Sequence, residues 1–232
     1  MSVCSSDFEE FIKINSLCGI NTNSLSAALT HPSYINENNL PYSDCYERLE
    51  FLGDSVLKLV VSDILFKRFP DYTEGKMTNI RATLVSDEFI LNFANDVKIG
   101  KYIRISSYLE KDGGRNTASI LSCAFEAVLG AMFESGIQYK DIYSFIEKLF
   151  DKYFPILEHQ MPKFNAKSIL QEYTQSVNQS LPLYSTKPVP DGFYTQVSYN
   201  SDIIGEGTAR SKRESEREAA YIACIKLNLI GE

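Results

Sequence analysis

The chain has 232 residues, of which 44% are hydrophobic, and its formal net charge at pH 7 is −7. This length and composition exclude a largely disordered protein and suffice for one large domain or two modest ones. The acidic balance, taken alone, argues against loose electrostatic attachment to nucleic acid or to anionic lipid.

Helix-period segments fill the chain as far as about Phe154, and no strand pattern interrupts them. Turn signals such as FPDYTEG and KDGGRN separate the segments. The sequence therefore predicts an all-α first domain over residues 1–154. The expected helical segments are residues 7–18, 24–30, 42–68, 77–96, 117–135 and 139–153.

The chain changes character after this helical part. Residues 155–163 contain two prolines and no periodicity, which is typical of a linker. Within residues 164–232, the helical AKSILQEYTQSV is followed by three β-rich runs and then by the amphipathic SKRESEREAAYIACIKLNL. The β-rich runs are LYSTKPV, FYTQVSYN and SDIIGEG. We therefore expect a multidomain protein of mixed class, an all-α domain followed by a small α-β-β-β-α domain.

Three carboxylates share one face of an expected helix, because Glu47, Glu50 and Asp54 stand at i, i+3 and i+7. Like charges repel, and a carboxylate is seldom buried without a cation. Asp44 and Glu47 have the spacing of a capping box, which would explain Glu47 alone. Gly53, in the helix interior, costs roughly 0.5–1 kcal/mol relative to alanine, so we expect another segment to approach it closely. Hard oxygen ligands of this kind favour Mg²⁺.

The five cysteines indicate neither a disulfide framework nor a zinc site, because they are odd in number, scattered and without a Cys-x-x-Cys pair. A reducing, cytoplasmic setting is therefore expected. The strongest apolar stretch, VLKLVVSDILF, is interrupted by Lys58 and Asp63, and the N-terminus lacks a basic flank, so we expect no membrane segment. The cysteines are Cys4, Cys18, Cys45, Cys123 and Cys224.

The stretch ERLEFLGDSVL resembles the signature motif of bacterial ribonuclease III almost letter for letter. ALTHPSY, FPDYTEG, IRATLVS, GGRNTASIL and FEAVLGA match further motifs of that family in order, and residues 163–230 resemble its double-stranded RNA-binding domain. The resemblance implies an all-α ribonuclease III domain followed by an RNA-binding domain. It also implies a metal-dependent endoribonuclease that leaves 5′-phosphate and 3′-hydroxyl ends, with ribosomal and other structured RNA as substrates.

By the same resemblance, Glu50, Asp54 and Glu126 hold the metal ion, and Asp54 and Glu126 are catalytic. Glu47 and Glu74 would line the same cleft and engage RNA near the cut. Mg²⁺ is the expected metal, with Mn²⁺ as the alternative. Metal ions held by carboxylates can activate water, stabilise the leaving oxygen and neutralise charge on the phosphate, so no organic cofactor is expected. The lone histidine of THPSY, His31, is expected to be structural.

One position departs from the family pattern, because Cys123 stands where the family has an aspartate. A thiol is mostly protonated at neutral pH, and even its thiolate is a poor ligand for Mg²⁺. Ser122 points about 100° away on a helix and is no obvious substitute. Three outcomes are open: a water fills the gap, the site shifts toward Mn²⁺, or cleavage is lost and RNA binding remains. We favour retained activity because the other five acids are present.

The aromatic residue of the signature, Phe51, would be read as plain core from the sequence alone. In the family the matching residue inserts into a pocket of a second subunit. The resemblance therefore predicts a homodimer with Phe51 at its contact. Twofold symmetry suits a duplex, whose two strands present phosphates related by a twofold axis.

Duplex RNA is recognised through shape, 2′-hydroxyls and phosphates, which also argues against DNA as a substrate. By resemblance, the RNA contacts come from polar residues of LQEY and from a cationic helix start. Because the module has near-zero net charge, we expect modest affinity and a shallow salt dependence. The short loop within VPDGFYT lacks the family's histidine, so we expect little minor-groove contact from it. The expected contact residues are Gln171, Glu172, Arg210, Lys212 and Arg213, with Arg217 as an addition.

Two function classes remain. The first is a metal-dependent endoribonuclease for double-stranded RNA, supported by the retained acids. The second is a non-cleaving or weakly active RNA-binding dimer, supported by Cys123.

Overall fold

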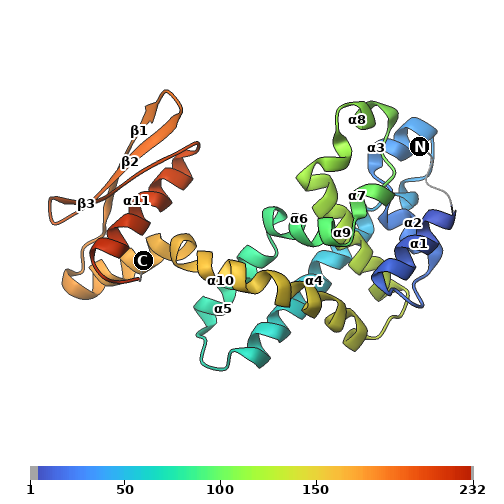
Figure 1. Cartoon of the computed structure of the whole chain (residues 1–232), viewed down its shortest axis with the longest axis horizontal. Helices are drawn as coiled ribbons and strands as arrows, with labels where there is room; N and C mark the ends of the chain where they lie inside the picture. The colour runs from blue at the N-terminus through green and yellow to red at the C-terminus, as the bar shows by residue number, and fades with distance from the viewer. Residues whose placement is uncertain (1–4, 231–232) are drawn as a thin grey trace. The chain divides into compact units, whose positions relative to one another are not determined.

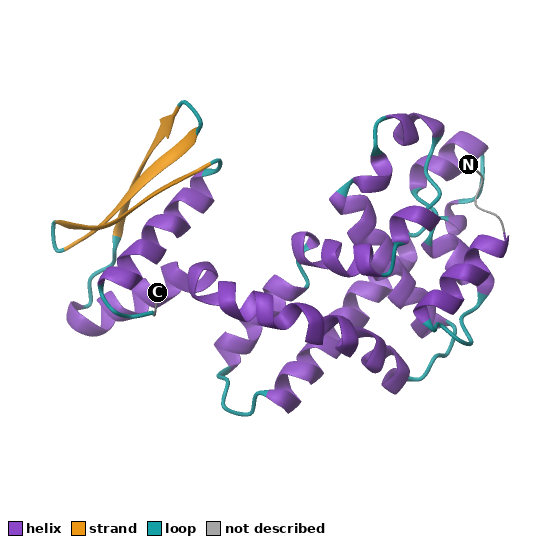
Figure 2. Ribbon diagram, viewed as in Figure 1, coloured by secondary structure: helices purple, strands orange, loops and turns teal. Residues whose placement is uncertain are grey.

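A computed structural model gives the structure of the chain (Figure 1), and it describes residues 5–230, without the side chains of residues 5, 6, 158–161 and 164. Cys4 therefore lies outside the described residues. The chain divides into two compact units, Met1–Lys152 and Tyr153–Glu232. The first unit is helical and the second carries the strands (Figure 2), which confirms the expected fold class.

The helical unit is built around two long helices, α4 (Glu47–Arg68) and α9 (Ala118–Glu134). Its extended backbone is limited, among the described residues, to one isolated bridge between Thr30 and Arg104. The remaining elements are α1 (Ser5–Asn15), α2 (Thr22–Ala28), α3 (Pro32–Asn38), η1 (Tyr42–Asp44), α5 (Glu74–Leu84), α6 (Asp87–Asp96), α7 (Ile99–Tyr102), α8 (Ser107–Lys111), η2 (Gly114–Asn116) and the first part of α10 (Tyr139–Asn178).

Two local expectations were wrong. The segment expected as one helix over residues 77–96 is two helices, α5 and α6, because the chain turns at Ser86, whose backbone N–H and hydroxyl both donate to the Thr83 carbonyl. Asp44 and Glu47 do not form a capping box, because Asp44 belongs to the 3₁₀ turn η1. Tyr46 is the residue that precedes α4, and its N–H donates to the Thr30 carbonyl at 3.0 Å.

Helices α4 and α9 cross in close contact at two glycines. A β-carbon on Gly53 would be 1.7 Å from the backbone oxygen of Glu126, and one on Gly130 would be 2.1 Å from that of Leu49. Only glycine permits such an approach, so the expected close contact at Gly53 is confirmed. Around the crossing, α4 buries Val56, Leu57, Val60, Val61, Ile64 and Leu65 against a nearly continuous buried run of α9.

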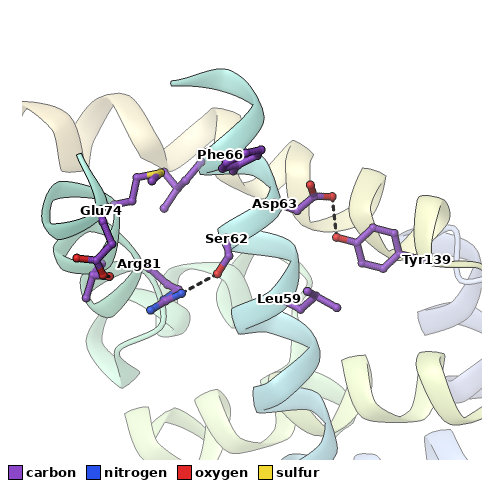
Figure 3. Close-up of a pocket in the computed structure, with 10 residues that line it drawn as sticks. Leu59, Ser62, Asp63, Phe66, Glu74, Arg81 and Tyr139 are labelled. Atoms are coloured by element: carbon purple, nitrogen blue, oxygen red, sulfur yellow. Dashed lines mark hydrogen bonds between the residues drawn. The ribbon is translucent and has the colours of Figure 1, made fainter. Parts of the chain in front are cut away.

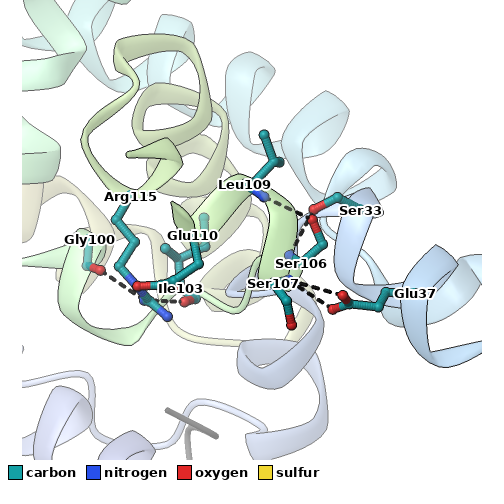
Figure 4. Close-up of polar contacts among 9 residues, drawn as sticks. All are labelled: Ser33, Glu37, Gly100, Ile103, Ser106, Ser107, Leu109, Glu110 and Arg115. Atoms are coloured by element: carbon teal, nitrogen blue, oxygen red, sulfur yellow. Dashed lines mark hydrogen bonds and ion pairs between the residues drawn. The ribbon is translucent and has the colours of Figure 1, made fainter. Parts of the chain in front are cut away.

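Arg115 fixes the loop that leads into α9 (Figure 4). Its Nη1 donates to the carbonyls of Gly100 and Ile103 at 3.1 and 2.6 Å, and its Nε donates to Glu110 at 2.7 Å. On the other side of α8, the N–H of Ser107 donates to Glu37 at 2.9 Å. The loop before α9 is therefore held to α7 and α8 by the charged hydrogen bonds of Arg115.

The expected linker is helical, because α10 runs without interruption from Tyr139 to Asn178 with Pro155 and Pro162 inside it. Each proline removes one backbone hydrogen bond from a helix. The residues between them, ILEHQM, contain no glycine and one β-branched residue, so the helix continues across both. Within the described part of the chain, no helix is long and apolar enough to cross a membrane.

The second unit holds one antiparallel sheet in the order β1-β2-β3, made of β1 (Leu183–Val189), β2 (Gly192–Tyr199) and β3 (Asp202–Ala209). Helix α11 (Lys212–Lys226) lies against this sheet (Figure 2). The backbone of α11 comes so close that a β-carbon on Gly205 would be 2.2 Å from the carbonyl of Ala219. The buried core consists of Ala166, Leu170, Val197, Ile204, Ala219, Ala220, Ala223 and Cys224.

Candidate metal centre and RNA-binding residues

Helices α4 and α9 bring four of the predicted side chains close enough together to affect pKa values within the group: Glu50, Asp54, Cys123 and Glu126. The crossing at Gly53 sets this arrangement, because it holds the turn that carries Asp54 against the backbone of Glu126. Electrostatic coupling follows from the proximity, since Asp54 and Glu50 both raise the pKa of Glu126. The structure thus brings Glu126 near two carboxylates that lie much earlier in the chain.

Glu126 is the most deeply buried acid of the group, with 9% of its surface exposed. Among the described residues, its carboxylate has no hydrogen-bond or ion-pair partner. Burial raises the pKa of Glu126 to about 8, and the neighbouring carboxylates of Asp54, Glu50 and Asp87 add to the shift. A buried, unpaired carboxylate beside other carboxylates is a poor structural element and a good cation ligand.

Cys123 behaves as a hydrogen-bond donor in this cluster. Burial raises the pKa of the Cys123 thiol to about 12, and the hydrogen bond to Glu50 raises it further. Burial also raises the pKa of Glu50, while the bond from the thiol lowers it. At neutral pH the thiol therefore stays protonated and holds Glu50 in place, and it offers no thiolate to a metal.

Asp54 and Glu47 occupy the two solvent-facing sides of the cluster. Asp54 forms an ion pair with Lys58 at 2.7 Å, one helical turn further on. Glu47 is exposed in the first turn of α4, and its Oε2 lies 3.8 Å from the sulfur of Cys45. His31 caps α3, where its Nδ1 accepts from the Ser33 N–H at 2.9 Å, so it has the structural role that we expected.

A further acid, Asp87, joins the cluster from the first turn of α6. It contributes to the raised pKa values of Glu126, Cys123 and Glu50. Its Oδ1 lies 3.2 Å from the hydroxyl of Ser122 on α9. Sequence reasoning missed Asp87, and the available signal was the run SDE at a helix start, which places an acid without telling what it faces.

The donor set suits a hard divalent cation. The oxygens of Glu50, Asp54 and Glu126 are the ligands Mg²⁺ prefers, and they repel one another without a cation between them. Among the side chains that the structure describes, no three His, Cys, Asp or Glu residues converge into a ready-made metal cage. Mg²⁺ usually keeps several waters and takes only one or two carboxylates directly, so loosely grouped acids fit it.

Glu74 does not join these acids within one chain. It begins α5, where it accepts a hydrogen bond from Thr78 at 2.8 Å, and it lines a different pocket of about 600 Å³ between α4 and α5 (Figure 3). Arg81 and Ser62 close one part of this pocket through a 2.9 Å hydrogen bond. The other lining residues are Leu59, Asp63, Leu65, Phe66, Met77, Thr78 and Tyr139.

Phe51 points into solvent, with 79% of its surface exposed, so it is not part of the core. Two further large apolar residues of the same helix, Leu59 and Phe66, are 56% and 72% exposed. A run of exposed apolar side chains along one helix is typical of an interaction surface.

In the second unit, Gln171 and Glu172 are exposed on α10, and Lys212 and Arg213 are exposed at the start of α11. Ser211 caps this helix by accepting the Glu214 N–H at 3.3 Å, which leaves the two cations in its first turn. Lys167 and Lys163 are paired with Glu216 and Glu218, at 2.7 and 2.5 Å. Arg210 is exposed just before the helix. Exposed basic side chains are therefore grouped around the start of α11, where Lys212 also forms a 4.0 Å ion pair with Glu216.

Family models match both units. Residues 21–152 match a model described as ribonuclease-III-like, and residues 166–227 match the double-stranded RNA-binding motif. The chain belongs to the ribonuclease III family. Curated relatives named ribonuclease 3 agree with this assignment over most of the chain. The relative from Listeria monocytogenes is 37% identical over 89% of this chain and 92% of its own length. That from Shouchella clausii is 36% identical over 95% and 86%.

A solved structure of the nuclease domain of ribonuclease III from Campylobacter jejuni is also similar. It is 35% identical, covers 64% of this chain and 99% of its own, and superposes with a TM-score of 0.58. These matches confirm the expected ribonuclease III endoribonuclease for double-stranded RNA, and they do not favour the non-cleaving alternative. Ribonuclease III enzymes depend on divalent metal, in agreement with the oxygen-rich centre between α4 and α9.

Proposed function

We propose that this ribonuclease III hydrolyses phosphodiesters of double-stranded RNA with Mg²⁺ held by Glu50, Asp54 and Glu126. The observation that carries the proposal is the carboxylate of Glu126, which is buried beside other carboxylates and lacks a hydrogen-bond partner among the described residues. Precursors of ribosomal RNA and other structured RNA are the proposed substrates, with 5′-phosphate and 3′-hydroxyl ends as products. The proposed setting is the cytoplasm, where the four described cysteines, all free, stay reduced.

The residues of the candidate metal centre have distinct parts in this proposal. When bound, Mg²⁺ supplies charge neutralisation at the phosphate and an acidified water. Glu126 and Asp54 hold the ion, and the Cys123 thiol orients Glu50 through its hydrogen bond. Lys58 fixes the rotamer of Asp54 through the 2.7 Å ion pair. Glu47 faces solvent at the edge of the centre, where RNA approaches.

The proposal includes a homodimer. Phe51 is exposed, and Leu59, which lines the pocket, follows it by eight residues on α4. Eight residues correspond to about 12 Å along a helix axis. Two copies related by a twofold axis between these points can each seat Phe51 in the pocket of the other. The Campylobacter jejuni structure is described as having a region involved in dimer formation. Glu74 lines the same pocket, so the proposed contact would also set its position.

The RNA-binding domain is proposed to comprise residues 164–232, with residues 155–163 connecting it to a catalytic domain of residues 1–154. Gln171 and Glu172 would contact ribose hydroxyls in the minor groove, and Lys212 and Arg213, with Arg210, would contact phosphates. The loop between β1 and β2 has only two residues, Pro190 and Asp191, which is too short for a deep groove contact.

The test is cleavage of a long, perfect RNA duplex by the purified protein in Mg²⁺ and separately in Mn²⁺. The parent chain is expected to cleave, and Glu126→Gln is expected to abolish cleavage. Cys123→Asp serves as the comparison that restores the family's aspartate. A parent chain that binds the duplex but stays inert in both metals, and is revived by Cys123→Asp, would replace this proposal with the non-cleaving alternative.

A further inference from the structure

The missing aspartate at Cys123 leaves the metal centre one carboxylate short, and a different element of the fold approaches the same place. Helix α6 packs against α9 and begins at Asp87. The side chain of Asp87 is exposed, so water can reach its carboxylate.

The contact between Asp87 and Ser122 locates the carboxylate. Ser122 is completely buried, and its hydroxyl lies 3.2 Å from Asp87 Oδ1 and 3.0 Å from the Ala118 carbonyl. Ser122 directly precedes Cys123 and stands four residues before Glu126. Residues at i and i+4 are neighbours on one helix face, with β-carbons roughly 5–6 Å apart. Asp87 is therefore held at the turn of α9 adjacent to Glu126.

The second oxygen of Asp87 remains available. Among the described residues Oδ2 has no hydrogen-bond partner. Oδ1 lies within hydrogen-bond distance of the Ser122 hydroxyl, whose single proton is also within reach of the carbonyls of Ala118 and Ser119. An anchored carboxylate with one open oxygen can accept a hydrogen bond from water on a cation. Glu126, which is buried, lies close enough to Asp87 for the Asp87 charge to raise its pKa.

We propose that Asp87 replaces the lost aspartate by holding a water of the metal ion, with Ser122 as the residue that positions it. This inference rests on the proposed metal-dependent function. Mg²⁺ keeps several of its waters in protein sites. A carboxylate that lies one helical turn from Glu126 can therefore hold the ion by accepting a hydrogen bond from one of these waters. The thiol of Cys123 meanwhile donates its hydrogen bond to Glu50.

The test is a double-mutant cycle on the full chain, with Mg²⁺ and Mn²⁺ binding measured by isothermal titration calorimetry beside the cleavage assay. Asp87→Asn keeps an oxygen for Ser122 and removes the charge. It is expected to weaken Mg²⁺ binding by about 10- to 100-fold, the usual effect of removing an outer partner of a metal ligand. In the Cys123→Asp background the same change is expected to cost less than about threefold, because the restored carboxylate makes Asp87 redundant.

Glu88→Gln is the matched control, because it removes the neighbouring exposed carboxylate of the same helix turn. It is expected to leave binding unchanged. Ser122→Ala is expected to weaken binding in the parent and to have little effect in Cys123→Asp, a pattern that a general loss of stability would not give.

The outcomes separate this inference from the proposed function. If the parent binds Mg²⁺ and cleaves, but Asp87→Asn does so equally well, Asp87 has no role in the site and the proposed function stands. If neither the parent nor Cys123→Asp binds a divalent ion, and Glu126→Gln gives the same titration as both, the proposed metal centre and the proposed role of Asp87 are both wrong.

Discussion

The backbone carbonyl of Glu126 lies against Gly53 so closely that a β-carbon on residue 53 would be 1.7 Å from its oxygen. Gly53→Ala must therefore push α9 away from α4. Overpacking of this kind typically costs about 1–3 kcal/mol and sometimes more, so we expect the free energy of unfolding to fall by about 3 kcal/mol and cleavage to drop with it. Urea denaturation measures the loss.

The matched control for this change is Gly75→Ala, because nothing lies within 4 Å of a β-carbon at that position in the first turn of α5. It is expected to stabilise the chain by roughly 0.5–1 kcal/mol, the usual advantage of alanine over glycine in a helix. A Gly53→Ala protein as stable as this control would show that the two helices can separate without cost.

The raised pKa of Glu126 predicts that, in the absence of divalent metal, the stability of the protein falls as the pH rises. Its pKa in the folded chain is raised to about 8 from an ordinary value of 4.5. Between these values the folded state binds more protons than the unfolded state, so the free energy of unfolding falls as the pH rises. We expect thermal unfolding in EDTA to shift to lower temperature from pH 5 to pH 8, and Glu126→Gln to flatten this trend. A profile that is the same in both proteins would contradict the raised pKa.

Divalent metal is expected to reverse this loss at pH 8, because a ligand that binds only the folded state stabilises it by mass action. At a concentration of 100 times Kd the gain is about 2.7 kcal/mol. Thermal unfolding with and without Mg²⁺ measures it. The gain should be largest where Glu126 is ionised and should nearly disappear in Glu126→Gln; an equal gain in both proteins would place the ion elsewhere.

Phe51→Ala is expected to convert the proposed dimer into a monomer, because it removes the most exposed apolar side chain of α4. Light scattering coupled to size-exclusion chromatography gives the mass directly. Tyr108→Ala is the control, since Tyr108 is 76% exposed on α8, away from the proposed contact. A parent chain that is already monomeric at micromolar concentration would exclude this dimer.

The start of α11 predicts the salt dependence of RNA binding. If Lys212 and Arg213 each contact a phosphate, removing both should weaken duplex binding for all sequences and lower the slope of log affinity against log salt by about two. Lys226→Ala, at the other end of the same helix, should change neither quantity. A slope that is unchanged in the double variant would mean that these cations face solvent only.

The sequence predicted the strands well, because alternation within FYTQVSYN and its neighbours is strong and local. The observed bounds of β1 are those expected, and β2 and β3 differ from expectation by one or two residues. The family motif placed Glu50, Asp54 and Glu126 in one site. Gly53 was correctly expected to meet another segment, because glycine in a helix interior is costly unless something approaches it.

What the sequence could not predict depends on contacts between distant segments. Asp87 comes near the candidate metal centre only because α6 packs on α9, and no local sequence pattern shows which residue a helix start will face. The separation of Glu74 from the other acids is equally a matter of packing, since it follows from the pocket between α4 and α5. The prolines of residues 155–163 suggested a break, but two missing hydrogen bonds do not interrupt a 40-residue helix.

The crossing of α4 and α9 also has a consequence for the order of events during synthesis. Asp54 and Glu126 come from helices far apart in the chain, so a nascent protein on the ribosome cannot assemble the proposed metal centre until α9 has emerged and docked. The helical unit is complete at Lys152, before any strand of the RNA-binding unit has been made. Domains fold as units during translation. The nuclease unit can therefore be folded for roughly several seconds while the RNA-binding unit is still being synthesised.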